Sequence, residues 1–320
     1  MESKMYVGID VCKNALDVAV RGTGEIWQEK NNPKGIDQLT EKLIKIKPTL
    51  IIMEATGGYE MEAALAFGKA DLPVAVVNPR LVRNFAKCTG KLAKTDKIDA
   101  KMLAHYGEAI KPEAQEMPED EAIKLHATLA RRRQLIEMLV AEKNRRGTAH
   151  KSLKKQIETH IEWLQRELSE VDEGLQEQIK NNEMWEAKGK VIRSVPGFGK
   201  VVTTTILADL PEAGVVNRKK ISALVGVAPY NCDSGGKQGI RIIWGGRASI
   251  RNALYMATVS AIRFNPIIKE HYKKLIDKGK PPKVALVACM RKLITIVNAM
   301  LRDMTLWEPD LAAKKKQIAT

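Results

Sequence analysis

The chain has 320 residues, of which 44% are hydrophobic, so it can bury a sizeable core and is predicted to form two or three domains. This composition excludes an intrinsically disordered chain. The 53 Lys and Arg residues outnumber the 38 Asp and Glu residues and give a formal net charge of +15, which favours nucleic acid as a partner over an anionic membrane surface.

The cysteines and the apolar segments indicate the compartment. The cysteines are far apart and form no CxxC pair, which argues against a disulfide framework and a structural zinc site. They are Cys12, Cys88, Cys232 and Cys289. The most apolar late stretch, 284–297, is interrupted by Arg291 and Lys292, and no charged leader with an apolar region precedes Met5. We therefore expect a protein of the reducing cytoplasm with no membrane partner.

Strand-like and helical patterns alternate from Met5 to about residue 110. Apolar residues 6–9 and the alternating residues 16–20 predict a hairpin with its turn at 11–14. A third strand is predicted at 25–30, a helix at 36–46, a strand at 50–53, a helix from Tyr59 and a strand at 74–77. This order predicts an α/β domain.

The middle of the chain has a helical pattern. Pro112 and Pro118 bracket an acidic linker, and residues 121–185 contain no proline. Apolar residues there recur at spacings of three and four, which predicts a long helix packed in a helical hairpin or a coiled coil. They are Leu153, Ile157, Ile161, Leu164, Leu168, Val171, Leu175 and Ile179. The default role of such a seam is structural or dimer-forming.

Glycine-rich loops and helices follow from about residue 189. Helices are predicted at 250–264 and 283–302, and the closing AAKKKQ is a solvated basic tail. The predicted domains are an α/β domain at 1–110, a linker and coiled-coil helical domain at 111–188, a mainly α C-terminal domain with a glycine-rich hairpin at 189–310, and the tail at 311–320.

Two acidic residues end apolar strands of the first domain. Asp10 follows YVGI, and Glu54 follows LIIM. Taken alone, Asp10 is interpreted as a residue that ends a strand at a turn. However, the carboxyl ends of strands in an open α/β sheet line a shared crevice, so Asp10 and Glu54 meet there if their strands are neighbours.

Two more carboxylates lie in KTDKIDA. Asp96 and Asp99 are three residues apart, on one face of a helix predicted to begin near Thr95. One interpretation is that they only complement the helix dipole, an effect of roughly 0.3–1 kcal/mol. The other is that four carboxylates bind Mg²⁺, because two such ions about 4 Å apart activate the nucleophile and stabilise the leaving oxygen in phosphodiester cleavage.

The C-terminal region offers groups that contact phosphate. IRSVPGFGKVVTTTIL resembles a helix-hairpin-helix element, in which Gly197 and Gly199 let backbone N–H groups approach a phosphate and Lys200 adds charge. A plain connection between two helices is the alternative. In CDSGGKQGIRIIWGGRASIRNALYMA, four further cations are candidate phosphate contacts. They are Lys237, Arg241, Arg247 and Arg251.

Two serines of the same stretch raise the question of covalent chemistry. Ser234 lies between Asp233 and two glycines, so its local interpretation is a β-turn residue. Ser249 is predicted to cap the following helix. No local Ser-His-Asp pattern selects either serine as a nucleophile.

Several motifs together resemble one family. GID at 8–10, MEATGGY at 53–59, VNPR at 77–80 and KTDKIDA at 94–100 are similar to the RuvC-like, RNase H-fold domain of DEDD transposases, the bacterial insertion-sequence recombinases guided by a bridge RNA. The similarity continues through SVPGFG, LVGVAPYNCDSGGKQG and GGRASIRNALYMA, and so covers nearly the whole chain.

The resemblance implies a set of site residues and partners. Asp10, Glu54, Asp96 and Asp99 would bind two Mg²⁺ ions, which Mn²⁺ can replace, and Ser234 would be the nucleophile. The implied partners are donor and target DNA, a structured guide RNA, and further copies of the chain in dimers that pair into a tetramer. The implied location is the bacterial cytoplasm, at the nucleoid.

Three other classes are weighed against this interpretation. VGIDVCKNALDVAV also resembles the first phosphate loop of actin-like and heat-shock ATPases, but 11–13 read VCK where those proteins have a small Gly-Thr or Gly-Ser loop. The alternative function is a RuvC-like structure-specific DNA endonuclease that uses the same carboxylates for hydrolysis only. A non-catalytic nucleic-acid-binding protein is the third class, which metal-dependent strand cleavage would distinguish.

Overall fold

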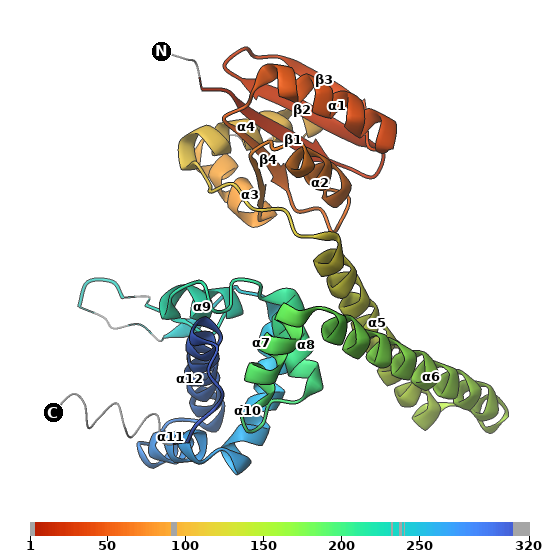
Figure 1. Cartoon of the computed structure of the whole chain (residues 1–320), viewed down its shortest axis with the longest axis vertical. Coiled ribbons are helices and arrows are strands. Elements are labelled where there is room, and N and C mark those ends of the chain that lie inside the picture. The colour runs from red at the N-terminus through yellow and green to blue at the C-terminus, as the bar shows by residue number, and fades with distance from the viewer. Residues whose placement is uncertain (1–3, 91–94, 232, 237–238, 240, 310–320) are drawn as a thin grey trace. The chain divides into compact units, whose positions relative to one another are not determined.

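The computed structural model describes residues 4–90, 95–231, 233–236, 239 and 241–309. The chain forms two compact units, Met1–Glu119 and Asp120–Thr320, called here the N-terminal and C-terminal units (Figure 1). Their division lies at the linker predicted after residue 110. The further boundaries at 188 and 310 stay a prediction.

The N-terminal unit contains a mixed five-stranded sheet in the order β3-β2-β1-β4-β5. The strands are β1 (Tyr6–Val11), β2 (Ala15–Arg21), β3 (Ile26–Lys30), β4 (Leu50–Glu54) and β5 (Val74–Val77). The β1–β2 and β2–β3 pairs are antiparallel, whereas β1–β4 and β4–β5 are parallel. The predicted hairpin and strands are therefore confirmed, and the sheet is consistent with the RNase H-like fold that the resemblance implies.

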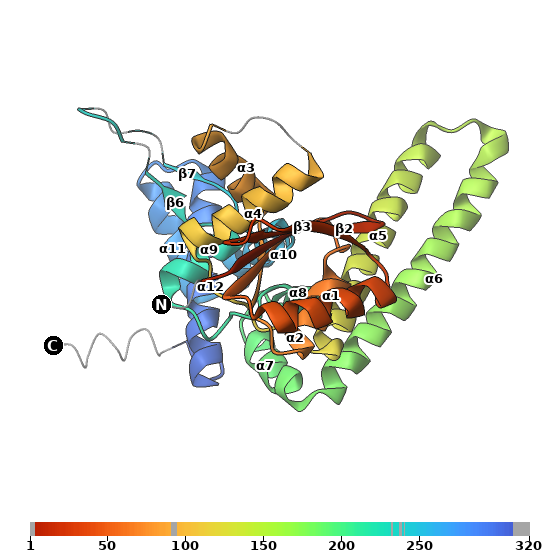
Figure 2. The same cartoon turned by 90° about the horizontal axis from the view of Figure 1, so that it is seen from above.

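Helices cover both faces of this sheet (Figure 2). One face packs against α1 (Pro33–Ile46) and α2 (Met61–Lys69), and the other packs against α3 (Pro79–Cys88) and α4 (Asp96–Ile110). Successive residues of β1 and β4 point to opposite faces, so both strands are buried on two sides and consist of continuous apolar runs.

Glycines let α4 lie directly on the sheet. A Cβ atom at Gly8 of β1 would come within 2.1 Å of the Ala100 carbonyl oxygen and 2.3 Å of the Ala104 nitrogen. A Cβ atom at Gly107 of α4 would come within 2.1 Å of Cδ1 of Ile52 in β4. At Gly8 no side chain separates the backbones of β1 and α4, and at Gly107 the Ile52 side chain lies directly against the α4 backbone. These two contacts fix the position of α4 on β1 and β4.

The C-terminal unit begins with a helical hairpin formed by α5 (Asp120–Thr148) and α6 (Lys151–Asn181). Leu125 and Leu129 pack with Leu175 and Ile179, and a second cluster contains the residues nearer the turn. That second cluster consists of Leu135, Leu139, Ile161 and Leu164, with Ile157, Leu168 and Val171 at its margin. Across the same pair of helices, Arg132 forms an ion pair with Asp172 at 2.5 Å.

The predicted apolar seam is confirmed, but its partner is α5 of the same chain. Leu164 is fully buried and Leu168 is half-buried against α5. The predicted helical hairpin is therefore confirmed, and the dimer-forming role considered for this seam stays a prediction. Leu153, the first residue of the predicted seam, lies outside the packed part and is 52% exposed.

The rest of the C-terminal unit is mainly helical. Its elements are α7 (Glu183–Arg193), α8 (Lys200–Asp209), α9 (Arg218–Val225), β6 (Pro229–Tyr230), β7 (Ile242–Ile243), α10 (Ala248–Phe264), α11 (Pro266–Asp277) and α12 (Pro282–Asp303). They surround one apolar core. The helix α12 is long and apolar enough to cross a membrane by length and composition, but Cys289, Leu293 and Val297 are fully buried in this core. It is a core helix of this unit.

We expect Gly8→Ala to destabilise the N-terminal unit by about 1–3 kcal/mol, because the new methyl group meets backbone atoms of α4 that cannot move as a flexible side chain does. Urea unfolding measures this change. The control is Gly174→Ala in α6, where an added Cβ atom meets nothing within 4 Å and the better helix propensity of alanine stabilises by up to about 1 kcal/mol. Wild-type stability of Gly8→Ala would contradict the close approach.

Candidate active site

The ends of two neighbouring parallel strands carry Asp10 and Glu54. Ile9 of β1 is in register with Met53 of β4, so the two acidic residues follow the same rung of the sheet. Both side chains are half-buried. The condition set by the sequence, that these two strands be neighbours, is met.

A buried carboxylate shapes the loop that follows Glu54. Glu60 is 5% exposed, and its Oε2 accepts hydrogen bonds from the Thr56 N–H (3.1 Å), the Thr56 hydroxyl (3.0 Å) and the Gly58 N–H (2.9 Å). Gly57 and Gly58 have φ angles of 79° and 117°, which favour glycine. Sequence reasoning missed Glu60, although an acidic residue two positions after a Gly-Gly turn is a signal for such a loop.

One side chain ties the loop after β1 to the loop after β4. The Asn31 Nδ2 donates to the Cys12 carbonyl at 2.8 Å and to the Tyr59 carbonyl at 3.2 Å. The segments that follow Asp10 and Glu54 are therefore held together by an amide that the sequence pattern did not single out.

The other two carboxylates lie in the first turn of α4. Thr95 is the N-cap, and its hydroxyl accepts from the Ile98 N–H at 3.3 Å. Asp96 is exposed and Asp99 is half-buried. The predicted helix start is confirmed, and the contact at Gly8 holds this helix against β1.

The four carboxylates share one electrostatic environment. Burial, followed by repulsion from Asp99, Glu54, Asp96 and Asp17, raises the pKa of Asp10 to about 6. Asp17 faces Asp10 across the β1–β2 pair and is buried, and both its carboxylate oxygens accept from the Gln28 Nε2 at 3.0 Å. Ionised Asp10 thus lies in a negative field that a proton or a bound cation relieves.

This donor set fits a hard divalent cation in charge and chemistry, because such ions bind carboxylate oxygens. Within the described ranges, however, no three carboxylate, histidine or cysteine side chains are grouped closely enough to hold a metal ion as they stand.

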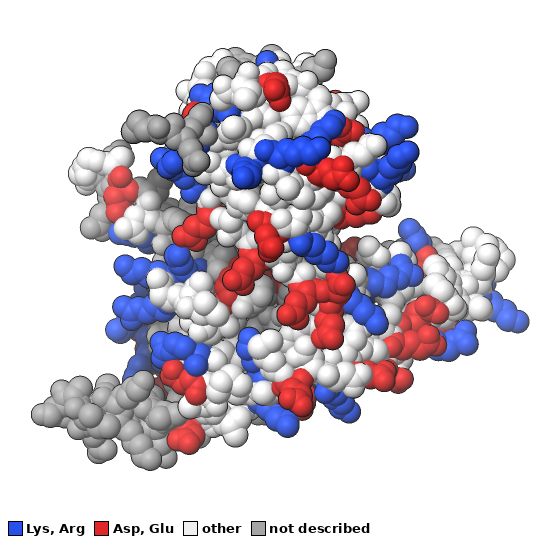
Figure 3. All heavy atoms as spheres, turned by 45° about the horizontal axis from the view of Figure 1, so that its top comes forward, with Lys and Arg blue, Asp and Glu red and all other residues white. Residues whose placement is uncertain are grey.

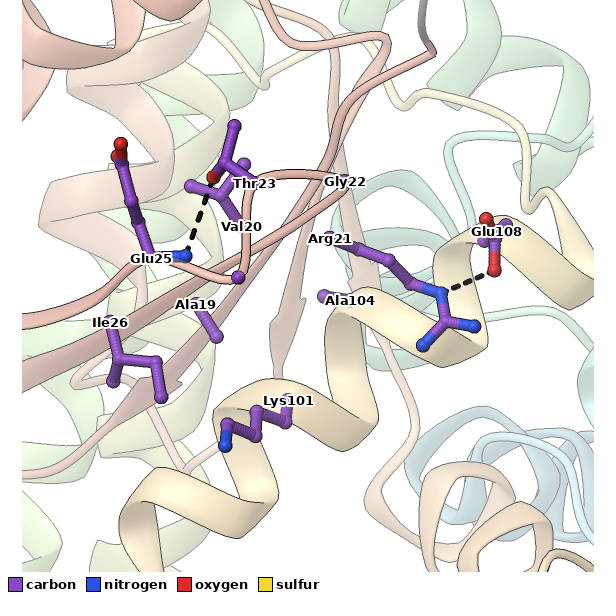
Figure 4. Close-up of a pocket in the computed structure, with 11 residues that line it drawn as sticks. Ala19, Val20, Arg21, Gly22, Thr23, Glu25, Ile26, Lys101, Ala104 and Glu108 are labelled. Carbon is purple, nitrogen blue, oxygen red and sulfur yellow. Dashed lines mark hydrogen bonds and ion pairs between the residues drawn. The ribbon is translucent and has the colours of Figure 1, made fainter.

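A shallow pocket of about 520 Å³ lies beside α4 (Figure 4). Arg21 and Glu108 form an ion pair at its edge and join β2 to the second half of α4, while Lys101 lies on its floor. None of the four carboxylates lines it. The ion pair between Arg21 and Glu108 at the edge of this pocket therefore attaches α4 to β2.

In the C-terminal unit, Ser234 lies in the loop between β6 and β7 and is exposed. Its neighbour Asp233 accepts from the Gly239 N–H at 3.0 Å and pairs with Arg241 at 3.3 Å. Among the residues that the structure describes, the Ser234 hydroxyl has no hydrogen-bond partner. Lys237, a predicted phosphate contact, lies outside the described residues.

Two predicted phosphate contacts are already engaged within the chain. Both Nη atoms of Arg247 donate to the Glu212 carboxylate at 2.6 Å, and Nη1 also donates to the Asp209 carbonyl at 3.0 Å. Burial alone would raise the pKa of Glu212, but the hydrogen bonds from Arg247 lower it. Arg251 donates to the Gly245 carbonyl at 2.6 Å. The donors of Arg247 thus hold the start of α10 to the α8–α9 loop, and its role as a phosphate contact stays a prediction.

The glycines before α8 differ from each other. A Cβ atom at Gly197, which has a φ angle of 103°, would lie 2.9 Å from the Ala261 nitrogen and 3.0 Å from the Ala257 carbonyl. Gly197 therefore packs against α10, and the approach of a phosphate to this turn stays a prediction. Gly199 and Lys200 are exposed at the start of α8.

Ser249 lies in the first turn of α10, but the N-cap is Arg247 and no side chain caps this helix.

We expect Asp10→Asn to stabilise the metal-free protein at neutral pH. The raised pKa of Asp10 means that the folded state binds the proton more tightly than the unfolded state, so stability falls as pH rises from about 4 to about 6. The variant should gain about 1–2 kcal/mol at pH 7.5, allowing for solvent screening, and almost nothing at pH 4. Urea unfolding in EDTA tests this, with the exposed Asp37→Asn as control. An equal gain at both pH values would contradict the repulsion.

Comparison with known proteins assigns the chain to a family. A DEDD transposase model of the IS110 type matches residues 7–149, and a model of the transposase IS116/IS110/IS902 family matches residues 189–273. Pilin gene-inverting proteins of Moraxella lacunata and Moraxella bovis are each 29% identical over 313 residues, which cover 94% of this chain and 97% of the relative. An IS900 protein of 42 kDa from Mycobacterium paratuberculosis is 26% identical over 149 residues, or 46% of this chain and 36% of that protein. The resemblance inferred from the motifs is thus confirmed at the level of the family, and the chain belongs to the IS110 family of DEDD transposases.

Proposed function

We propose that the protein is a site-specific DNA recombinase that cuts and rejoins strands with the four carboxylates and Ser234. The observation that carries the proposal is the raised pKa of Asp10, because it places Glu54, Asp96 and Asp99 in one electrostatic environment with Asp10. Perturbed carboxylates of this kind gather at catalytic centres. Family membership adds that the substrate is DNA and that the reaction uses a divalent metal ion.

Asp10, Glu54, Asp96 and Asp99 would hold the metal, which we propose to be two Mg²⁺ ions, replaceable by Mn²⁺. When bound, these ions would supply activation of the attacking oxygen and stabilisation of the leaving oxygen. The chain's own contribution is to hold the ligands in place. Glu60 and Asn31 fix the loops that follow two of them, and the contact at Gly8 fixes the helix that bears the other two.

The covalent step is assigned to Ser234. Its Oγ would bond to the phosphorus of one strand, the 3′ or 5′ oxygen of the broken bond would leave with a proton, and the ester would keep the phosphodiester energy without ATP. A strand end with a free hydroxyl would then attack the same phosphorus and release the serine. Its exposure and the absence of a hydroxyl partner among the described residues leave Ser234 accessible. Arg241, which pairs with Asp233 at 3.3 Å on the exposed loop, would exchange that carboxylate for the phosphate.

The carboxylates and Ser234 belong to different compact units. We propose that they act together, in one chain or between chains, when dimers pair into a tetramer on donor and target DNA. A structured guide RNA would select the DNA, in the cytoplasm at the nucleoid. The net charge of +15 supports polyanionic partners, and the pilin gene-inverting name of two relatives over nearly the whole chain supports rejoining as well as cutting.

Substitution of the carboxylates should separate cleavage from binding. Asp10→Asn and Asp99→Asn are each expected to lower the rate of strand cleavage by at least about 100-fold, because the metal would lose a ligand. DNA affinity should not fall, since removing a negative charge does not weaken a basic surface. Gel assays with and without EDTA measure both properties, and Asp37→Asn is the control. Cleavage at the wild-type rate in the Asp10→Asn, Asp99→Asn double variant would refute the assignment.

Substitution of the serine should separate recombination from hydrolysis. A nicked substrate should trap a detergent-resistant protein–DNA adduct that mass spectrometry maps to Ser234. Ser234→Ala should lose the adduct and recombination but bind DNA, while Ser249→Ala keeps all three. Recombination by Ser234→Ala would refute the covalent step, and metal-dependent cleavage without any adduct in the wild type would favour the hydrolytic endonuclease.

A further inference from the structure

Charge is separated along the helical hairpin. The hairpin tip, defined as residues 143–155, contains six Lys or Arg residues and no Asp or Glu. The remainder of α6, residues 156–181, contains seven acidic and two basic residues. Figure 3 shows that basic and acidic side chains each gather in other places of the drawn face as well. Along α6 itself, a short basic block comes before an acidic stretch, which is called here the acidic shaft.

Most of these cations have no ion-pair partner among the described residues. Arg145 pairs with Glu142 at 2.6 Å, and Arg146 pairs with Glu158 at 2.8 Å. The four lysines of the tip form no ion pair with the residues that the structure describes. They are Lys143, Lys151, Lys154 and Lys155, and all four are exposed.

The lysines of α6 are placed where they oppose folding. Lys151, Lys154 and Lys155 share one helix face at spacings of three and four, so they repel one another. They also occupy the start of α6, whose first turn contains no acidic residue, although the positive end of the helix dipole favours acidic residues there. Apolar packing does not compensate, since Leu153 is 52% exposed. These lysines lower the stability of α6, and no contact among the described residues compensates for that loss. Such a destabilising arrangement indicates that the lysines bind a partner molecule.

The tip is also far from the core of its unit. Ile179 packs at the base of the hairpin against α5, and Lys151 is 28 residues earlier on the same helix, or about 40 Å at 1.5 Å per residue. Figure 2 shows the turn between α5 and α6 at the end opposite α7. The lysines are therefore presented on a rigid arm.

We propose that the hairpin tip binds the phosphate backbone of a nucleic-acid duplex. Lysines are point charges suited to phosphate without base selection, and an anion there would relieve both their mutual repulsion and the clash with the helix dipole. The tip contains no Phe, Tyr or Trp on which unpaired bases would stack. The acidic shaft repels the same backbone, so contact is limited to the few phosphates that the tip reaches. The class of partner rests on the proposed function.

The test compares two variants of the full chain with equal change of charge. The tip variant carries Lys151→Gln, Lys154→Gln and Lys155→Gln. The control, called the shaft variant, carries Lys124→Gln in α5 and Arg166→Gln and Lys180→Gln in α6, all outside the tip. Affinity for a DNA duplex and for an RNA duplex is measured by fluorescence anisotropy between 50 and 200 mM salt, in EDTA, so that binding is scored without cleavage and independently of recombination.

For at least one duplex, the tip variant should lose at least about tenfold in affinity at 100 mM salt, and the slope of log K against log salt should fall by about two to three, since each lost phosphate contact removes about 0.9. The duplex that shows the loss identifies the source of the phosphate. The tip variant should unfold at the wild-type temperature or above, and a Lys→Arg triple variant at the same positions should keep the affinity. Wild-type affinity and slope of the tip variant for both duplexes, or an equal loss in the shaft variant, would overturn the proposal.

Discussion

The contact between Gly8 of β1 and the backbone of α4 is the constraint on which the candidate site depends. Without a side chain at Gly8, the backbone of α4 reaches the backbone of β1, and Gly107 makes room for the Ile52 side chain of β4. Asp96 and Asp99 in the first turn of α4 therefore act on Asp10. A wider spacing between helix and sheet would leave two acidic strand ends and an ordinary helix start, with no shared field.

Such a concentration of acidic groups lowers the stability of the protein that holds it. At neutral pH Asp10 is ionised although burial and four neighbouring carboxylates oppose its charge. The surrounding structure offsets this cost with hydrogen bonds that do not involve the four proposed ligands. Glu60 accepts three donors of its own loop, and Asp17 accepts from Gln28. Local instability at a centre supported by its neighbours is typical of a functional site.

The sequence predicted what local patterns encode. Apolar runs gave the strands, Thr95 marked the start of α4, and the seam of α6 followed from spacings of three and four. It could not predict which group faces a given side chain across the fold. Gly197 and Gly8 both require a close approach, yet α10 approaches one and α4 the other. Arg247 has a side chain of the type that binds phosphate, but its donors form hydrogen bonds with Glu212, 35 residues away.

The two units differ in net charge. Residues 1–119 contain 17 basic and 17 acidic residues, whereas residues 120–320 contain 36 basic and 21 acidic residues, so the second unit carries the whole net charge of +15. Four carboxylates repel the phosphate that they are proposed to process, and a unit without net charge does not offset that repulsion. The excess of positive charge that attracts nucleic acid lies in the C-terminal unit. Because Arg247 is held by Glu212, the exposed lysines of the hairpin tip, which form no ion pair with the described residues, are available for that attraction.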